Sequence, residues 1–189
     1  MDYTSNIKKY IQEEIEVYKS LDVDIINRII NEIKDAQERG STIYICGNGG
    51  SAATASHYCC DFNRDVDHHC GKTGNFICLS DNVPTMMAIA NDYSYDEVFS
   101  YQLKNRLKQD DILFVISGSG NSKNIVKAME VAREKGNTII GLCGYDGGKV
   151  KEMSNICLHV KIDNMQIVED THMMLDHCMM YILNYSFKK

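Results

Sequence analysis

Proline, CxxC pairs and long apolar runs are scarce or absent in this sequence, and each absence narrows what the chain can be. A single proline among 189 residues, with no low-complexity stretch, leaves no candidate linker, so one domain is favoured over two. No apolar run approaches the ~20 residues that a membrane-spanning helix needs. We therefore expect one compact domain without a membrane span.

Concentrated positive charge is also lacking. The formal net charge is -6, and no cluster of Lys and Arg stands out. Binding to a nucleic-acid backbone needs such a cluster, so nucleic acid is not the expected partner. A small molecule is favoured instead.

Eight cysteines are present, mostly inside apolar runs and never as a CxxC pair. They are typical of reduced core residues rather than a disulfide scaffold or a zinc ribbon. The first residues show no signal-peptide h-region. We expect a cytoplasmic protein.

Helical spacing occurs twice in residues 4–39. The two apolar stripes are Ile7, Tyr10, Ile11, Ile15 and Tyr18, and Val23, Ile26, Ile29, Ile30 and Ile33. Two successive helices must bury these stripes on a sheet or on a partner subunit. We expect residues 1–39 to be a helical pair that serves packing or oligomerisation, and 40–189 to be the core of the same domain.

From residue 41, short β-branched runs alternate with helical patterns. The expected strands are 42–46, 76–79, 112–116, 138–142 and 156–160, and the expected helices are about 51–62, 84–90, 96–108, 121–135, 147–153 and 166–186. This alternation predicts an α/β fold with a five-stranded, mostly parallel, doubly wound sheet.

Two glycine-serine turns, residues 46–51 and 117–122, each follow an expected strand and precede an expected helix. Such a turn leaves unpaired N–H groups at the positive end of a helix dipole, where an anion can accept them. Ligands of doubly wound sheets bind at the carboxyl ends of strands. The pair predicts a site for a polar, phosphorylated ligand, although serine and glycine also make ordinary turns and caps.

The first turn also matches part of a dinucleotide fingerprint, through Gly47, Gly49 and Ala52. The acidic residue that ends the next strand, Asp81, lies about thirty residues on rather than the usual ~20. The fingerprint also leaves the second serine turn unexplained. Dinucleotide binding is therefore the weaker interpretation.

Ionisable groups gather at two further places. His57 and Asp61 are four residues apart on one expected helix and face the same way, as metal ligands or an acid–base pair would. Residues 169–177 place Glu169, Asp170, His172, Asp176 and His177 in an otherwise apolar last helix. Polar groups in such surroundings are costly unless something binds them.

Helix periodicity does not choose the ligands within that last helix. Asp170 and His177 are nearly in phase, whereas Glu169 and His177 differ by roughly 80°. An exposed, solvated stripe is the simpler alternative. His68 and His69 are typical of a surface loop.

Taken together, these motifs resemble the sugar isomerase (SIS) domain family, and within it the phosphoheptose isomerases. The resemblance rests on the N-terminal helical pair, the segments 47–53, 91–92 and 119–122, His57 four residues before a carboxylate, and His177. It implies a flavodoxin-like SIS fold and a homotetramer with active sites at subunit interfaces.

The resemblance also implies the residues of the site. The implied substrate-binding residues are Asn48, Gly49, Gly50, Ser51, Asp92, Ser117, Gly118, Ser119, Ser122 and Glu169. The implied ligands of a divalent metal, zinc in the family, are His57, Asp61, Glu169 and His177. Asp61 and His177 are the expected base and acid, with Glu169 as the alternative base if Asp61 is committed to the metal.

Three positions depart from the family pattern. Asp61 stands where glutamate is usual, Glu169 where glutamine is usual, and Arg64 lies one residue from the usual arginine. The resemblance implies aldose–ketose isomerisation of sedoheptulose 7-phosphate. Two alternatives stay open at this point: an isomerase of another sugar phosphate, and a non-catalytic SIS module that binds a sugar phosphate or a protein.

Overall fold

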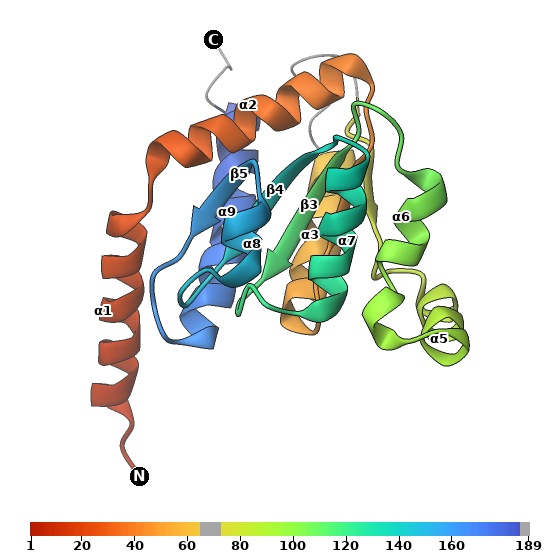
Figure 1. The fold of residues 1–189 in the computed structure, drawn as a ribbon. Coiled ribbons are helices and arrows are strands. Elements are labelled where there is room, and N and C mark those ends of the chain that lie inside the picture. Colours follow the sequence, from red (N-terminus) through yellow and green to blue (C-terminus); the bar gives the residue numbers. More distant parts are fainter. Residues whose placement is uncertain (65–72, 186–189) are drawn as a thin grey trace.

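The computed structural model describes residues 1–64 and 73–185. Its centre is a five-stranded parallel sheet, which confirms the predicted fold class (Figure 1). The strands are β1 Ile43–Cys46, β2 Phe76–Cys78, β3 Ile112–Ser117, β4 Thr138–Cys143 and β5 Ile156–His159. His68 and His69 lie outside the described residues.

The strand order is β2-β1-β3-β4-β5, with every neighbouring pair parallel. This is the flavodoxin-like order, in which the chain moves outward in opposite directions from the gap between β1 and β3. Ligands of such sheets bind at the carboxyl ends of the strands beside this gap. Both glycine-serine turns follow the two strands that flank it.

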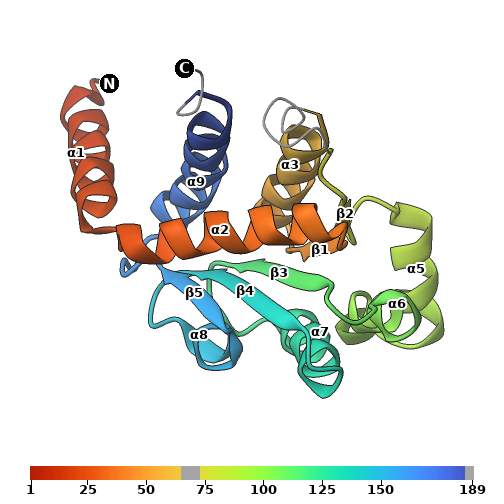
Figure 2. The same cartoon turned by 90° about the horizontal axis from the view of Figure 1, so that it is seen from above.

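Helices cover both faces of the sheet. They are α1 Thr4–Ser20, α2 Val23–Arg39, α3 Gly50–Arg64, α5 Val83–Asp92, α6 Ser100–Arg106, α7 Lys123–Glu134, α8 Gly148–Met153 and α9 Met165–Tyr185. Figure 2 shows α3 and α9 on one face of the sheet and α5, α6, α7 and α8 on the other. None of the helices in the described ranges is both long and apolar enough to span a bilayer.

The alternation of side chains along each strand creates two cores. Ile43 and Ile45 of β1 pack with residues of α2, α3 and α9, whereas Tyr44 and Cys46 pack with the helices of the opposite face. Both sets are buried, because a central parallel strand is covered on its two sides. The seven cysteines in the described ranges are free thiols.

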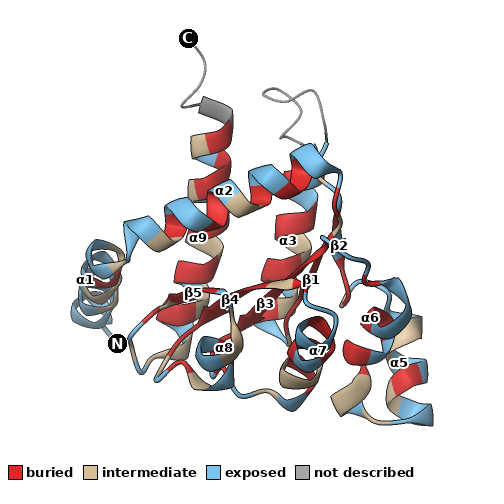
Figure 3. Cartoon of the chain, turned by 45° about the horizontal axis from the view of Figure 1, so that its top comes forward, coloured by how far each residue is buried: buried red, intermediate tan, exposed pale blue. Residues whose placement is uncertain are grey.

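The two N-terminal helices differ in what they bury. Asp22 caps α2 by accepting from the backbone N–H groups of Asp24 and Ile25, and the isoleucine stripe of α2 is buried in the core that includes α3 and α9. On α1, in contrast, only Val17 is buried, and Ile7 and Ile11 are 57% and 50% exposed. In Figure 3 the ribbon of α1 is mostly pale blue with some tan, whereas the ribbon of α2 carries red segments.

One expected helix, 96–108, is divided in the structure. A short 3-10 turn, Tyr95–Glu97, precedes α6. The Ser100 hydroxyl donates to the backbone carbonyl and the carboxylate of Glu97. Such local hydrogen bonds compete with the helical pattern, and periodicity alone does not reveal them.

Candidate active site

The turn after β1 is held by a side-chain network around Asn48. The amide groups of Asn48 and Asn124 exchange hydrogen bonds of 2.9 and 2.8 Å, and the Tyr95 hydroxyl donates to Asn48 Oδ1 at 2.9 Å. Asn124 lies in the first turn of α7, so this network fixes the β1 turn against the helix that follows β3. The two glycine-serine turns are therefore neighbours, as the sequence predicted.

The turn after β3 leaves two hydroxyls available. The Ser117 Oγ is buried and has no hydrogen-bond partner among the described residues. Ser122 is the N-cap residue of α7, yet its side chain makes no capping hydrogen bond. At Gly120, φ is +65° and an added Cβ would collide with the Gly147 carbonyl, so glycine is needed to form this turn. An unpaired hydroxyl in a buried turn indicates a missing polar partner.

These groups line one pocket of about 160 Å³. Its lining consists of Asn48, Ser51, Ile116, Ser117, Gly118, Ser119, Ser122, Met165 and Glu169. The pocket is rich in hydroxyl donors and lies beside the N-termini of α3 and α7. Its composition suits an anionic group such as a phosphate ester.

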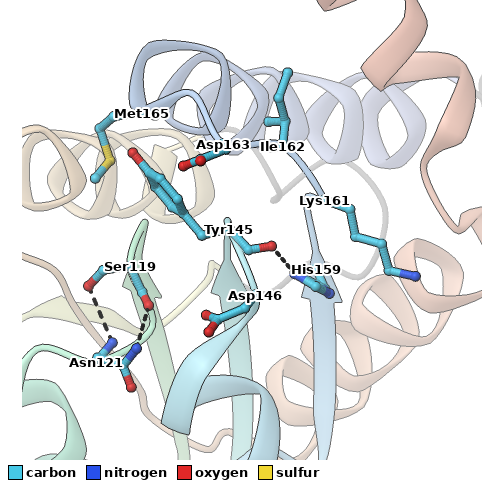
Figure 4. Close-up of a pocket in the computed structure, with 9 residues that line it drawn as sticks. All are labelled: Ser119, Asn121, Tyr145, Asp146, His159, Lys161, Ile162, Asp163 and Met165. Atoms are coloured by element: carbon cyan, nitrogen blue, oxygen red, sulfur yellow. Dashed lines mark hydrogen bonds between the residues drawn. The ribbon is translucent and has the colours of Figure 1, made fainter.

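A larger open cleft of about 860 Å³ adjoins this pocket and shares Ser119 and Met165 with it (Figure 4). Its wall includes Tyr145 and His159, and the His159 Nε2 donates to the Tyr145 carbonyl at 2.9 Å. Asn121 holds the Ser119 side of the cleft, because its Nδ2 donates to the Ser119 carbonyl at 3.0 Å. The phosphate-sized pocket therefore opens into a wider cleft.

A second cluster joins α3 to α9. His57, Asp61, Asp176 and His177 each place one potential ligand atom within 4.8 Å of the others. The His57 Nε2 lies 3.1 Å from His177 Nε2, 3.5 Å from Asp61 Oδ2 and 3.6 Å from Asp176 Oδ2. Two imidazoles and two carboxylates are a donor set that fits a divalent metal ion.

Asp176 is the buried member of this cluster. Its side chain has an exposed fraction of 0%, and neither carboxylate oxygen has a hydrogen-bond partner in the part of the chain that the structure describes. Burial, with a smaller contribution from the charge of Asp61, raises the pKa of Asp176 to about 7. Two carboxylates held close together in this way are stabilised by a cation between them.

Comparisons with known proteins identify the family. The SIS domain model matches residues 2–144. The phosphoheptose isomerase of Helicobacter pylori (strain P12) is 34% identical over 172 residues, which cover 90% of this chain and 89% of that protein. The chain belongs to the SIS domain family and, within it, to the phosphoheptose isomerases.

Solved structures agree with this assignment. A phosphoheptose isomerase from Francisella tularensis matches with a TM-score of 0.85 and 30% identity, over 97% of this chain and 99% of that chain. One from Neisseria gonorrhoeae matches with a TM-score of 0.86 and 28% identity, over 96% and 98%. As a member of this family, the protein is a sugar-phosphate isomerase, and the resemblance found in the sequence is confirmed.

The structure brings together part of the predicted substrate site. Asn48, Ser51, Ser117, Gly118, Ser119, Ser122 and Glu169 line one pocket. Gly49, Gly50 and Asp92 are not among the residues that line it. Asp92 ends α5, is exposed, and accepts a hydrogen bond from Asn91 Nδ2 at 2.9 Å.

Three of the four predicted metal ligands lie together in the structure. His57, Asp61 and His177 are in the cluster, and the fourth place is taken by Asp176 rather than Glu169. Asp176 lies in the ionisable run of the last helix, and periodicity alone does not distinguish it from its neighbours. The one available signal is the apolar residues on its side of the helix, Leu175, Met179 and Met180, among which a carboxylate needs a partner.

The other ionisable residues of α9 have separate surroundings. Asp170 accepts a hydrogen bond from the Tyr10 hydroxyl, which ties α1 to α9 and raises the pKa of Tyr10. His172 has an exposed fraction of 0%, and burial lowers its pKa to about 4. Among the described residues, neither belongs to the cluster of His57, Asp61, Asp176 and His177.

Proposed function

We propose that the protein interconverts sedoheptulose 7-phosphate and D-glycero-D-manno-heptose 7-phosphate. The observation that carries the proposal is the pairing of a hydroxyl-lined pocket at the β1 and β3 ends with a two-histidine, two-carboxylate cluster between α3 and α9. The pocket suits a phosphate, and the cluster suits chemistry at a carbonyl group. The names of the curated relatives support the heptose as the sugar.

The phosphate would be held by the serines of the two turns. Ser51 lies in the first turn of α3, and Ser122 is the N-cap of α7, so both helix N-termini offer backbone N–H groups as well. The Ser117 hydroxyl, which has no hydrogen-bond partner among the described residues, would gain an acceptor. Each such bond to an anion contributes about 1.5–3 kcal/mol.

The metal would be held by the cluster of His57, Asp61, Asp176 and His177, and we propose zinc. Imidazole nitrogens and carboxylate oxygens are ordinary zinc ligands. The oxygens of buried Asp176, which lack a hydrogen-bond partner in the described part of the chain, fit a cation. When bound, a divalent ion supplies Lewis acidity toward the carbonyl and hydroxyl oxygens of the sugar.

The reaction needs one proton moved between carbons and one between oxygens. A base removes the proton from C1 of the ketose to give an enediolate, and the same proton or its replacement is delivered to C2, while the hydroxyl proton passes from O1 to O2. We propose Asp61 as the base, through a carboxylate oxygen that the metal leaves free, and His177 as the acid, through the ring nitrogen that does not hold the metal. Glu169 is the alternative base if Asp61 is wholly committed to the metal.

We propose that residues 1–189 form one SIS domain that assembles as a homotetramer in the cytoplasm, with active sites at subunit interfaces. The exposed isoleucines of α1 support assembly, because Ile7 and Ile11 are 57% and 50% exposed on one stripe and exposed apolar patches mark interaction sites. The helical pair 1–39 would supply that interface. His177 is also exposed in the single chain, which is consistent with a site completed by a neighbour.

The test is an NMR time course of the purified, zinc-loaded protein with sedoheptulose 7-phosphate, beside a chelator-treated sample. We expect signals of the aldoheptose phosphate to appear, and chelation to abolish them. Conversion that is unaffected by chelation would contradict the metal role. Absence of conversion, with sugar-phosphate binding still detectable, would instead favour another sugar-phosphate substrate.

A further inference from the structure

The helix α1 packs on the rest of the chain through a small area. Val17 is its buried residue, in an apolar cluster with Val160, Ile167 and Val168. Tyr10 is partly buried against the same cluster, and its hydroxyl donates to the carboxylate of Asp170 on α9. Apolar contacts have no preferred direction, whereas a hydrogen bond to a carboxylate fixes both distance and orientation. The Tyr10 hydroxyl therefore makes the directed contact between α1 and α9.

Asp170 lies in the part of α9, residues 165–170, that forms one side of the serine-lined pocket. Met165 and Glu169 line that pocket. Met165 and Val168 also lie against the ends of two strands: an added Cβ on Gly118 would collide with Met165, and one on Gly144 would collide with Val168. A shift of this part of α9 would therefore move two side chains of the pocket.

The bond to Tyr10 acts on this part of α9 from outside the pocket. Asp170 directly follows Glu169, so the two side chains point about 100° apart around the helix. Asp170 is exposed, whereas Glu169 lines the pocket. A contact that holds Asp170 therefore fixes how far α9 is rotated, and with it the direction of the Glu169 side chain.

The later turns of α9 are held by different contacts. Leu175, Met179, Met180 and Leu183 belong to the large core that includes residues of α2 and α3. None of these four is in the small cluster that contacts α1. Loss of the bond to Tyr10 would therefore loosen the end of α9 at the pocket and leave the end near His177 in place.

We propose that Tyr10 is a positioning residue: its hydrogen bond to Asp170 holds the first turns of α9 and so sets where Glu169 and Met165 lie in the serine-lined pocket. The link between α1 and α9 stands on their contacts alone. The effect on a bound sugar phosphate rests on the proposed function.

The experiment compares Tyr10→Phe with Tyr18→Phe, its matched control. The Tyr18 hydroxyl donates to Glu14 Oε1 at 3.1 Å within α1, and the Tyr18 side chain packs against the same apolar cluster. Each variant loses one hydroxyl from α1. Only Tyr10→Phe loses the bond to α9.

Two variants test the acceptor. Asp170→Ala removes it and should behave as Tyr10→Phe does. Asp170→Asn keeps a side-chain oxygen that can accept from the tyrosine, so it should stay close to the wild type. The double variant Tyr10→Phe/Asp170→Ala should be no worse than either single variant, because both remove the same bond.

The first measurement is amide hydrogen exchange with no sugar present, followed by mass spectrometry of peptides that cover residues 165–172. We expect exchange to be about 2–10-fold faster in Tyr10→Phe and Asp170→Ala, and unchanged in Tyr18→Phe. The mass from light scattering should equal that of the wild type in all variants. A lower mass in Tyr10→Phe would assign its effect to assembly and overturn the positioning role.

The second measurement is steady-state kinetics with sedoheptulose 7-phosphate and zinc in excess. We expect KM to rise about 3–10-fold in Tyr10→Phe and Asp170→Ala, with kcat within about 2-fold of the wild type, because ground-state binding is what is lost. Tyr18→Phe and Asp170→Asn should keep the wild-type KM. A general loss of stability would not produce this split between KM and kcat.

Three results would overturn the proposal. Wild-type exchange in Tyr10→Phe would show that the bond does not hold α9. Faster exchange with an unchanged KM would separate this part of α9 from the pocket, and equal effects in Tyr18→Phe would assign them to the packing of α1. A wild-type protein without turnover would contradict the proposed function instead, and the exchange data would still decide whether Tyr10 holds α9.

Discussion

The Nε2 atoms of His57 and His177 lie 3.1 Å apart, although the two residues are 120 positions apart in the chain. Their rings meet edge to face, with centroids 5.1 Å apart. Two ring nitrogens this close can share one proton or one cation, but two protonated rings would repel each other. The packing of α3 against α9 therefore creates a binding position that neither helix has alone.

Replacing His177 by alanine should abolish most of the catalysis. Loss of an acid–base group typically costs 10²–10⁴-fold, and loss of a ligand weakens metal binding too, so we expect kcat to fall at least about 100-fold. Steady-state kinetics with zinc in excess measure this. Cys178→Ala, at the next position of α9, is the matched control and should stay near the wild-type rate. An equal loss in the control would show that the helix, not His177, was disturbed.

Removing the serine hydroxyls should weaken binding of the phosphate. For Ser119→Ala and Ser122→Ala we expect kcat/KM to fall by about 10–100-fold each, since each bond to an anion contributes about 1.5–3 kcal/mol. Thermal stability should change little, because neither side chain caps a helix and Ser119 is exposed. Ser20→Ala, on α1, is the control. Unchanged kinetics in both variants would argue against the pocket as the phosphate site.

Gly50→Ala should move Glu169 without unfolding the protein. The added Cβ collides with the end of a flexible side chain, which can move at little cost, so the free energy of unfolding should change by about 1 kcal/mol or less. We expect kcat/KM to fall by up to about 100-fold, because displacing a group of an active site by about 1 Å can cost that much. Ala53→Ser, at an exposed position of the same helix, is the control. A fully active Gly50→Ala enzyme would show that the position of Glu169 is unimportant.

Buried His172 should make stability depend on pH. Burial lowers its pKa to about 4, whereas an unfolded histidine titrates near 6.5. Between these values the unfolded chain binds more protons, so the free energy of unfolding falls as pH decreases from about 6.5 to about 4, by at most about 1.4 kcal/mol per pH unit.

The measurement is urea unfolding of metal-free wild type and His172→Leu across this pH window. Asp176, whose raised pKa gives a slope of opposite sign, is present in both proteins and cancels in the difference. We expect the wild type to lose more stability on acidification than the variant. Parallel curves would contradict a neutral buried His172.

The exposed stripe of α1 should control assembly. A charge at Ile11, which is 50% exposed, would be buried at a subunit interface, so Ile11→Glu should lower the mass measured by light scattering. Lys8→Glu, at an exposed polar position of the same helix, changes charge without entering the apolar stripe and should keep the wild-type mass. A tetramer that survives Ile11→Glu would place the interface elsewhere.

The fold could be predicted largely from the sequence because its signals are local. The expected strand 112–116 differs from the observed strand, Ile112–Ser117, by one residue. The two glycine-serine turns mark the edge of the sheet at which a ligand is expected to bind. The division of residues 96–108 could not be predicted, since it depends on a side-chain bond between Ser100 and Glu97.

The cluster of His57, Asp61, Asp176 and His177 was only partly predictable, for a geometric reason. The spacing of His57 and Asp61 is a property of one helix and could be read directly. Whether Glu169 or Asp176 joins them depends on the height at which α9 packs against α3. This height depends on tertiary packing and cannot be read from one helix. The structure shows it, because a Cβ added to Gly50 of α3 would collide with the Glu169 carboxylate of α9.

The parallel course of α3 and α9 sets the separation between the serine-lined pocket and the cluster of His57, Asp61, Asp176 and His177. Two helical turns, about 10.5 Å, lie between Glu169 and Asp176, and a rigid pair of packed helices holds this interval constant. With the phosphate in the serine-lined pocket and a metal at the proposed cluster, a bound sugar needs a carbon chain long enough to reach from one to the other. We therefore expect a pentose phosphate, two carbons shorter than a heptose phosphate, to bind by its phosphate without reaching the cluster.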